Sequence, residues 1–337
     1  MPYTIYDISQ KAGVSIATVS RVLNGSSNVK PATREKVMQV IKEFDYTPNA
    51  FARGMGLGSL RTVGILCADS SDSFLAKAVY YLERELHAHG YESLLCCTGY
   101  DLEDRRNYVN LILSKKVDSL ILVGSNFVSV TDTDNTYIRD AATQVPVMLL
   151  NASYNCPNVY STLCNDQESM YEATSCMLRS GIRDILYLYD SNSYSSVKKM
   201  AGYREAMSEN QIPDFEHLIR YYGGKSDDFR AIADCIERAA EEGLTFHGVI
   251  GSDDSLAVGA MKYATRKGLC VPKDLAVIGY NNSVLACCTS QEITSVDNRL
   301  ETLTHQLVQT LLGVLSGLEM PAQSLFSGQL IKRDTTP

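Results

Sequence analysis

The chain has 337 residues, of which 45% are hydrophobic, and its formal net charge is −8. This length and composition predict two or three globular domains with apolar cores. No apolar run approaches the ~20 residues of a membrane helix, and the first residues lack the basic and apolar regions of a secretory signal. We therefore expect a cytoplasmic protein with no membrane partner.

The cysteines and the charges further limit the class of protein to which the chain can belong. The ten cysteines are scattered, with no CxxC pair and no Cys/His spacing suited to zinc. We expect reduced thiols, no metal and no cofactor. Residues 1–61 carry a net charge of +4, and the remaining chain carries −12. This asymmetry suggests a polyanionic partner for the N-terminal segment.

Residues 1–46 predict a small all-α head. Thr4 is a good N-cap for a first helix, with Asp7 three residues later as in a capping box. Gly13 ends this helix, and Ser15 caps a second one. The second helix has an apolar inner face of Val19, Val22 and Leu23. A third helix runs from about residue 31 to 44, so the pattern is that of a helix-turn-helix.

The outward face of the second helix is unusual. It combines small hydroxyl and apolar side chains with one arginine: Ile16, Ala17, Thr18, Ser20 and Arg21. Short side chains let a helix enter the major groove, hydroxyls can donate to phosphates, and arginine can reach a guanine edge. An ordinary surface helix pair has the same spacing, so the spacing alone leaves both alternatives open.

A family resemblance decides between them. The stretches "TIYDISQKAGVSIATVSRVLNG" and "TREKVMQVIKEFDYTPNAFAR" closely resemble the DNA-binding head of the lac repressor family of bacterial transcription regulators, at nearly every position from 4 to 53. The resemblance implies that Ile16, Ala17 and Arg21 read bases. It assigns mainly to phosphates the residues Thr4, Ser15, Thr18, Ser20 and Asn24.

Residues 47–60, "TPNAFARGMGLGSL", form the predicted hinge segment. The composition alone is typical of a flexible linker, because an isolated helix this short is unstable in water. The resemblance implies a hinge helix that folds only on the operator, with Met55 as an apolar wedge in the minor groove. The DNA-binding candidates here are Asn49, Ala52, Arg53 and Met55. The three glycines of the segment raise the ordering cost and predict strong coupling between hinge order and DNA binding.

Strand and helix signals alternate along residues 61–337. Strands are predicted at 62–68, 91–97, 118–124 and 145–151, and then at 184–190, 217–222, 246–252 and 275–280. Helices are predicted near 74–89, 103–114, 135–142, 166–180, 196–210, 226–241 and 254–267. Two such series predict an α/β body of two doubly wound parallel-sheet lobes.

The body resembles periplasmic sugar-binding proteins and the effector domains of the same repressor family. The resemblance implies three crossings between the lobes. It gives an N-lobe of about 61–160 plus 290–320 and a C-lobe of about 161–289 plus 321–333. Ligands of such folds bind beyond the carboxyl ends of the strands, so we expect a cleft between the lobes.

Residues near strand ends, in register with the family, form the candidate effector site. They are Asp69, Ser71, Asp72, Phe74, Ser125, Asn151, Lys199, Asp253 and Asn281. The resemblance places Lys199 where the family has arginine, Asp72 where it has asparagine, and Asn281 where it has an acidic residue. Acids, amides and an aromatic ring suit the hydroxyls of a neutral sugar. The residues leave open that the effector is instead a purine, a phosphosugar or an amino sugar.

These features together predict a regulator and not an enzyme. The chain has no GxGxxG or P-loop motif, and its five histidines form no visible nucleophile–base set. We expect a homodimer, most simply a repressor, that binds a palindromic DNA operator and whose lobe angle changes with a small-molecule effector. The sequence leaves open inducer or corepressor action, and a protein co-regulator.

Overall fold

The computed structural model describes residues 3–23, 28–46 and 59–337, and the chain divides into two compact units. We call the unit up to Thr62 the head and the unit from Val63 to Pro337 the body. Of the predicted hinge segment, residues 47–58 lie outside the described part of the chain.

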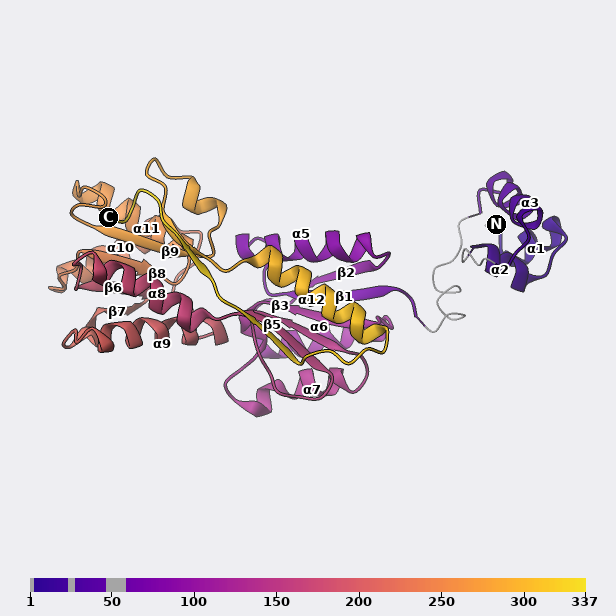
Figure 1. Cartoon of the computed structure of the whole chain (residues 1–337), viewed down its shortest axis with the longest axis horizontal. Coiled ribbons are helices and arrows are strands. Elements are labelled where there is room, and N and C mark those ends of the chain that lie inside the picture. Colours follow the sequence, from indigo (N-terminus) through magenta and orange to yellow (C-terminus); the bar gives the residue numbers. More distant parts are fainter. Residues whose placement is uncertain (1–2, 24–27, 47–58) are drawn as a thin grey trace. The chain divides into compact units, whose positions relative to one another are not determined.

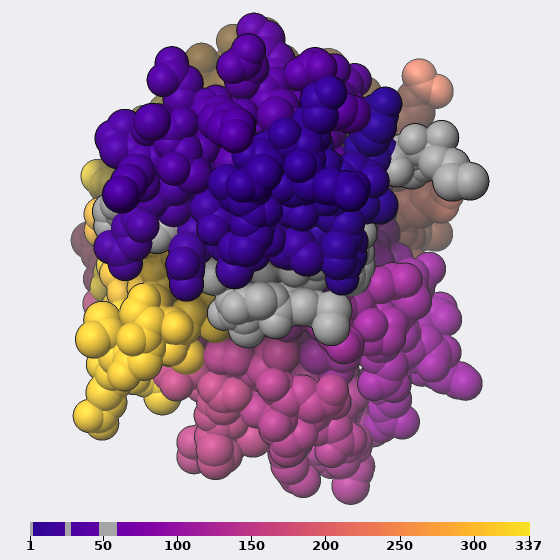
Figure 2. All heavy atoms as spheres, turned by 90° about the vertical axis from the view of Figure 1, so that its right-hand side faces the viewer, coloured from indigo at the N-terminus to yellow at the C-terminus, as the bar shows by residue number. Residues whose placement is uncertain are grey.

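Three helices form the head, which is a small, closely packed unit (Figure 2, indigo). They are α1 (Ile5–Ala12), α2 (Ile16–Leu23) and α3 (Pro31–Glu43). Thr4 caps α1 as predicted, because its backbone nitrogen and its hydroxyl both donate to Asp7 Oδ2 at 2.7 Å. Gly13 ends α1 in the left-handed conformation, at φ 64°. Side chains from all three helices form the core, including Ile8, Ala12, Val19, Val22, Val37 and Val40.

A six-stranded sheet forms the N-lobe of the body, in the order β11–β5–β4–β3–β1–β2; Figure 1 labels β1, β2, β3 and β5 of it. Its strands are β1 (Thr62–Cys67), β2 (Glu92–Cys97), β3 (Ser119–Val123), β4 (Val147–Leu150), β5 (Val159–Cys164) and β11 (Gln323–Phe326). Its helices are α5 (Ser73–Ala88), α6 (Leu102–Ser114), α7 (Thr136–Ala142) and α12 (Leu300–Leu315). Two short 3-10 turns are η1 (Ser125–Phe127) and η2 (Asp132–Asn135). Because α5 and α12 share one apolar cluster and α6 and α7 share another, helices cover both faces of the sheet.

A second six-stranded sheet forms the C-lobe, in the order β12–β10–β9–β8–β6–β7. Its strands are β6 (Ile185–Tyr189), β7 (Ile219–Tyr221), β8 (Gly248–Gly251), β9 (Ala276–Tyr280), β10 (Thr294–Asp297) and β12 (Gln329–Ile331). Its helices are α8 (Asp166–Arg179), α9 (Tyr194–Glu209), α10 (Phe229–Glu241) and α11 (Asp254–Lys267), with 3-10 turns η3 (Phe215–Leu218) and η4 (Val284–Cys287). Only β12 runs antiparallel among the strand pairs of this sheet. The predicted fold class, two parallel-sheet α/β lobes with a helical head, is confirmed.

The chain crosses between the two sheets three times, after β5, after β10 and between β11 and β12. The crossings lie later than the sequence analysis placed them. β5 extends the N-lobe to Cys164, β10 belongs to the C-lobe, and β11 returns to the N-lobe. The last three strands mix polar with apolar residues (TSVD, QSLF and QLI), so they lack the apolar runs that marked most of the other strands.

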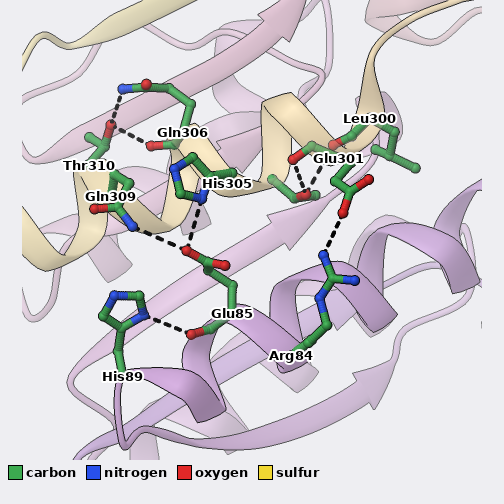
Figure 3. A network of polar contacts seen from close by, with 10 residues as sticks. Arg84, Glu85, His89, Leu300, Glu301, His305, Gln306, Gln309 and Thr310 are labelled. Carbon is green, nitrogen blue, oxygen red and sulfur yellow. Dashed lines mark hydrogen bonds and ion pairs between the residues drawn. The ribbon is translucent and has the colours of Figure 1, made fainter.

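In addition to their shared apolar cluster, polar contacts join α12 to α5 (Figure 3). Glu85 Oε1 accepts hydrogen bonds from His305 Nδ1 at 2.9 Å and from Gln309 Nε2 at 3.2 Å. Arg84 Nη2 donates to Glu301 Oε1 at 2.6 Å. The chain enters α12 directly after the second crossing. These contacts therefore hold the segment that follows the crossing against α5 of the N-lobe.

Three further properties of the described residues bear on function. No helix among them is both long and apolar enough to traverse a lipid bilayer. All ten cysteines are free thiols. Within the same described ranges, no group of three His, Cys, Asp or Glu side chains has a geometry that could hold a metal ion.

Candidate functional site

The exposed side of α2 carries the residues that the sequence analysis assigned to base contacts. Ile16, Ala17 and Arg21 are exposed, whereas Val19 and Val22 are buried in the core of the head. Thr18 and Ser20 are half-buried on the same helix. The helix therefore offers a face of small side chains with one guanidinium, a shape that fits the major groove.

Two of the candidate phosphate contacts also cap helices. Ser15 Oγ accepts a hydrogen bond from Thr18 N at 3.2 Å, and the two hydroxyls lie 2.9 Å apart. The hydrogen bonds from Thr4 hold the pKa of Asp7 below its ordinary value. The other DNA-binding candidates lie outside the described residues: Asn24, Asn49, Ala52, Arg53 and Met55.

The body contains a cleft of about 460 Å³ that is lined from both lobes. Seven of the nine candidate effector residues line it: Asp72, Phe74, Ser125, Asn151, Lys199, Asp253 and Asn281. Asp69 and Ser71 do not. Asp69 Oδ1 instead accepts hydrogen bonds from the backbone and hydroxyl of Ser71, at 2.8 and 2.7 Å, which lowers the pKa of Asp69. This carboxylate turns back on its own loop and does not line the cleft.

Helix starts and strand ends position the lining residues. Asp72 caps α5 by accepting from Leu75 N at 2.8 Å, and Asp253 caps α11 by accepting from Leu256 N at 2.9 Å. Asn151 follows β4 and Asn281 follows β9, with φ of 63° and 93°. A left-handed backbone is tolerated by asparagine better than by most residues, and it turns the chain directly after each strand.

Lys199 of α9 lies in the floor of the cleft and is buried. Its Nζ donates to the carbonyl of Ser252 at 2.8 Å and lies 3.9 Å from the centre of the Tyr280 ring. Burial raises the pKa of Asp72 and of Asp190, and the positive charge of Lys199 opposes that rise. The pKa of Asp253 rises to about 7, mainly through burial and then through the charge of Asp190.

The sequence analysis missed several lining residues, among them Tyr100, Arg105, Asn126, Asp190, Ser193 and Ser195. Asp190 directly follows β6, so its strand-end position was a signal that could have identified it. Ser193 matters because its Oγ accepts a hydrogen bond from Ser125 Oγ across the cleft, at 2.9 Å. This contact joins the C-lobe to the N-lobe at the cleft.

Several buried polar atoms at the cleft have no hydrogen-bond partner within the described part of the chain. They are Asn126 Nδ2, Asn151 Oδ1 and Ser196 Oγ. An unsatisfied buried polar group costs about 1–3 kcal/mol. One donor, one acceptor and one hydroxyl can therefore bind a ligand that both donates and accepts hydrogen bonds.

A helix-turn-helix head joined to a two-lobed body with a polar cleft defines a class of bacterial transcription regulators. Residues 4–49 match the description "Bacterial regulatory proteins, lacI family", and residues 174–336 match "Periplasmic binding protein-like domain". The chain belongs to the lacI family of bacterial regulatory proteins. It is a DNA-binding transcriptional regulator in a non-enzymatic family, as the sequence analysis predicted.

Similar proteins cover most or all of the chain. An HTH-type transcriptional regulator of Lachnoclostridium phytofermentans is 46% identical, over 98% of this chain and 99% of the relative. The HTH-type transcriptional regulator AscG of Escherichia coli is 30% identical, over 98% of each chain. A crystal structure of the lac repressor dimer bound to operator and the anti-inducer ONPF matches with a TM-score of 0.88 at 25% identity, over 100% of this chain and 99% of that chain. A sugar-binding regulator of the lacI family from E. coli, complexed with phosphate, matches with a TM-score of 0.70 at 26% identity, over 82% of this chain and 98% of that chain.

Proposed function

We propose that the chain represses transcription as a homodimer on a palindromic operator, and that a small hydroxylated molecule, most simply a sugar, controls operator affinity from the cleft. The cleft carries this proposal, because both lobes line it and it holds unsatisfied donors and acceptors. A ligand that bridges the lobes favours one lobe angle over another, which is the kind of closure that switches such folds. Inducer and corepressor action are both compatible with this geometry.

The chemistry of the lining supports a hydroxylated ligand. Each sugar hydroxyl both donates and accepts, so it can satisfy Asn126 Nδ2, Asn151 Oδ1 and Ser196 Oγ. Phe74 and Tyr100 add aromatic surface for an apolar sugar face. A phosphosugar fits poorly, since its phosphate would enter a cavity lined by Asp72, Asp190 and Asp253. The similarity to a regulator described as sugar-binding supports a sugar as the ligand class.

Exposed apolar side chains on the N-lobe support dimerisation. β2 is an edge strand of its sheet, and Leu94 and Leu95 on it are exposed, as is Tyr80 of α5. Covering such an edge with a second copy removes apolar surface from water. A dimer presents two heads, which matches a palindromic operator, and the lac repressor structure similar to this chain is a dimer bound to operator.

The DNA-binding part of the proposal is tested by selecting duplexes from random DNA with the full chain and measuring affinity by fluorescence anisotropy. We expect a palindromic consensus to be enriched. Arg21→Ala should weaken binding to it by about 10–100-fold, because a bidentate arginine–guanine contact contributes about 1–3 kcal/mol. Arg21→Lys is the matched control, since it retains the charge but not the planar fork. It should lose specificity while retaining affinity for unrelated DNA, and equal affinities of both variants and wild type would refute base reading by Arg21.

A further inference from the structure

Three acidic side chains line the cleft together with Lys199, and a fourth, Asp166, accepts a hydrogen bond from the lining residue Ser195. Asp72, Asp190 and Asp253 line the cleft with Lys199, and Asp166 is buried at the start of α8. The charge of Lys199 acts on all four carboxyl groups. Of the four, only Asp166 accepts hydrogen bonds from two side-chain hydroxyls, those of Ser195 and Tyr280, both at 2.6 Å.

The cations present do not neutralise this cluster by contact. Among the described residues, no carboxylate oxygen lies within 4.0 Å of Lys199 Nζ, which donates to the Ser252 carbonyl instead. Arg105, the other cation that lines the cleft, donates to backbone carbonyls, including those of Tyr100 at 3.2 Å and Asp101 at 3.3 Å. The lining therefore holds three acidic side chains against two cations, and burial raises the pKa of all three acids.

A second observation is independent of the charges. Asn151 and Ser196 line the same cavity and are 6% and 5% exposed, yet Asn151 Oδ1 and Ser196 Oγ have no partner within the described ranges. Hydroxyl groups of a ligand can satisfy these two atoms, and a positive charge on the same ligand would meet the acidic side chains. A bound metal ion does not meet both needs, and the described residues contain no group of three acidic, His or Cys side chains that could hold one.

We propose that the effector is an amino sugar, a hydroxylated ring whose primary ammonium lies beside Asp190 and Asp253 and whose hydroxyls meet Asn126, Asn151 and Ser196. This inference rests on the proposed function, because it names the ligand class of the same cleft. An ammonium donates three hydrogen bonds and supplies the positive charge that the cluster lacks. A neutral sugar satisfies the hydroxyl partners but leaves the carboxylates uncompensated, and an N-acetylated sugar does the same.

Matched triplets of sugars test the proposal on the full chain. Glucosamine, galactosamine and mannosamine are each compared with the parent hexose and with the N-acetylated form, first by thermal shift and then by titration calorimetry. We expect at least one free amine to bind tenfold or more tightly than both of its neutral counterparts. Asp190→Asn and Asp253→Asn should each remove this preference, and asparagine retains the capping of α11. Asp227→Asn, at an exposed carboxylate of the same lobe outside the cleft, should retain it.

The outcomes separate this inference from the proposed function. If a parent hexose or an N-acetylated form binds as tightly as its amine, the amino-sugar inference is overturned while a sugar effector stands. If no amine binds, the inference is likewise overturned. A preference for the amine that survives both cleft substitutions, in variants whose melting temperatures show that they fold, would contradict the role given to Asp190 and Asp253.

Discussion

Asp253 combines two roles in one side chain. It caps α11 through Leu256 N, and it lines the cleft near Asp190. The first role favours the charged carboxylate, because the positive end of a helix attracts an anion. The second opposes it, since burial and the charge of Asp190 raise the pKa of Asp253 to about 7. The protein without ligand therefore bears a cost for this carboxylate at neutral pH.

Asp253→Asn should stabilise the protein at alkaline pH. The folded-state pKa of about 7 lies above the ordinary value of 3.8, so the folded protein holds this proton more tightly than the unfolded chain. The stability that this proton contributes is complete below the ordinary pKa and is lost as the pH rises towards 7. We expect the variant to melt about 2–4 °C above wild type at pH 8, which corresponds to a gain on the order of 1 kcal/mol, and no higher at pH 4. A difference that does not vary with pH would contradict this account of Asp253.

The cleft residues show what strand-end reasoning can and cannot predict. Asn151 was assigned to the site because it follows a buried strand of a parallel sheet, and Asn281 because the family resemblance marks that strand end. Asp190 occupies an equivalent position and was overlooked, because no family motif marked it. Asp69 does not line the cleft, because its contact with Ser71 depends on the local turn of one loop. The spacing of residues along the sequence does not predict the direction in which a loop side chain points.

At the scale of elements, close packing of α8 against α9 positions the cleft floor. A Cβ on Gly202 of α9 would lie 2.1 Å from the carbonyl oxygen of Gln167 in α8. Glycine therefore allows the two helix backbones to approach each other. Because α9 also carries Lys199, the position of the cleft floor depends on this contact.

Gly202→Ala should destabilise the body and weaken ligand binding in the cleft. Glycine within a helix normally costs about 0.5–1 kcal/mol relative to alanine, so a neutral site would gain stability from this change. Here the clash should outweigh that gain and lower the melting temperature by several degrees. Ser208→Ala, at an exposed position of the same helix, is the control and should change little. A variant of Gly202 that is more stable than wild type would show that the helices do not depend on this approach.

The hinge segment gives a second prediction at this scale, based on sequence alone. Gly56→Ala should lower the cost of ordering a hinge helix, and so tighten operator binding and weaken the response to effector. Anisotropy titrations with and without effector measure both quantities. An unchanged operator affinity would count against coupled folding of the hinge.

Element prediction succeeded where caps or apolar runs were clear and failed at strands that mix polar with apolar residues. The head helices followed from Thr4, Gly13 and an apolar face, because capping and 3.6-residue periodicity are local properties. The body strands β1 to β4 and β6 to β9 were predicted from the sequence. β5 was not identified, and the three short strands β10 to β12 are held in place by sheet pairing with distant segments, which no local signal reveals.

At the scale of the whole molecule, the proposed function requires that the arrangement of the two lobes controls DNA binding. The crossings join two sheets that are otherwise separate, and Ser125 and Ser193 touch across the cleft. A ligand with different affinities for two lobe arrangements shifts operator affinity by its differential binding energy. A coupling of about 1–3 kcal/mol corresponds to about 5–150-fold in affinity.

Locking the lobes with a disulfide tests this claim most directly, because it needs no knowledge of the effector. Ser125→Cys combined with Ser193→Cys places two thiols where the hydroxyl oxygens lie 2.9 Å apart. Operator affinity of the double variant is measured reduced and oxidised, with each single variant oxidised in parallel and the bridge verified by mass spectrometry. We predict that the bridge changes operator affinity at least fivefold and abolishes the response to ligand. Equal affinity of the bridged and reduced forms would contradict control of DNA binding by the lobes.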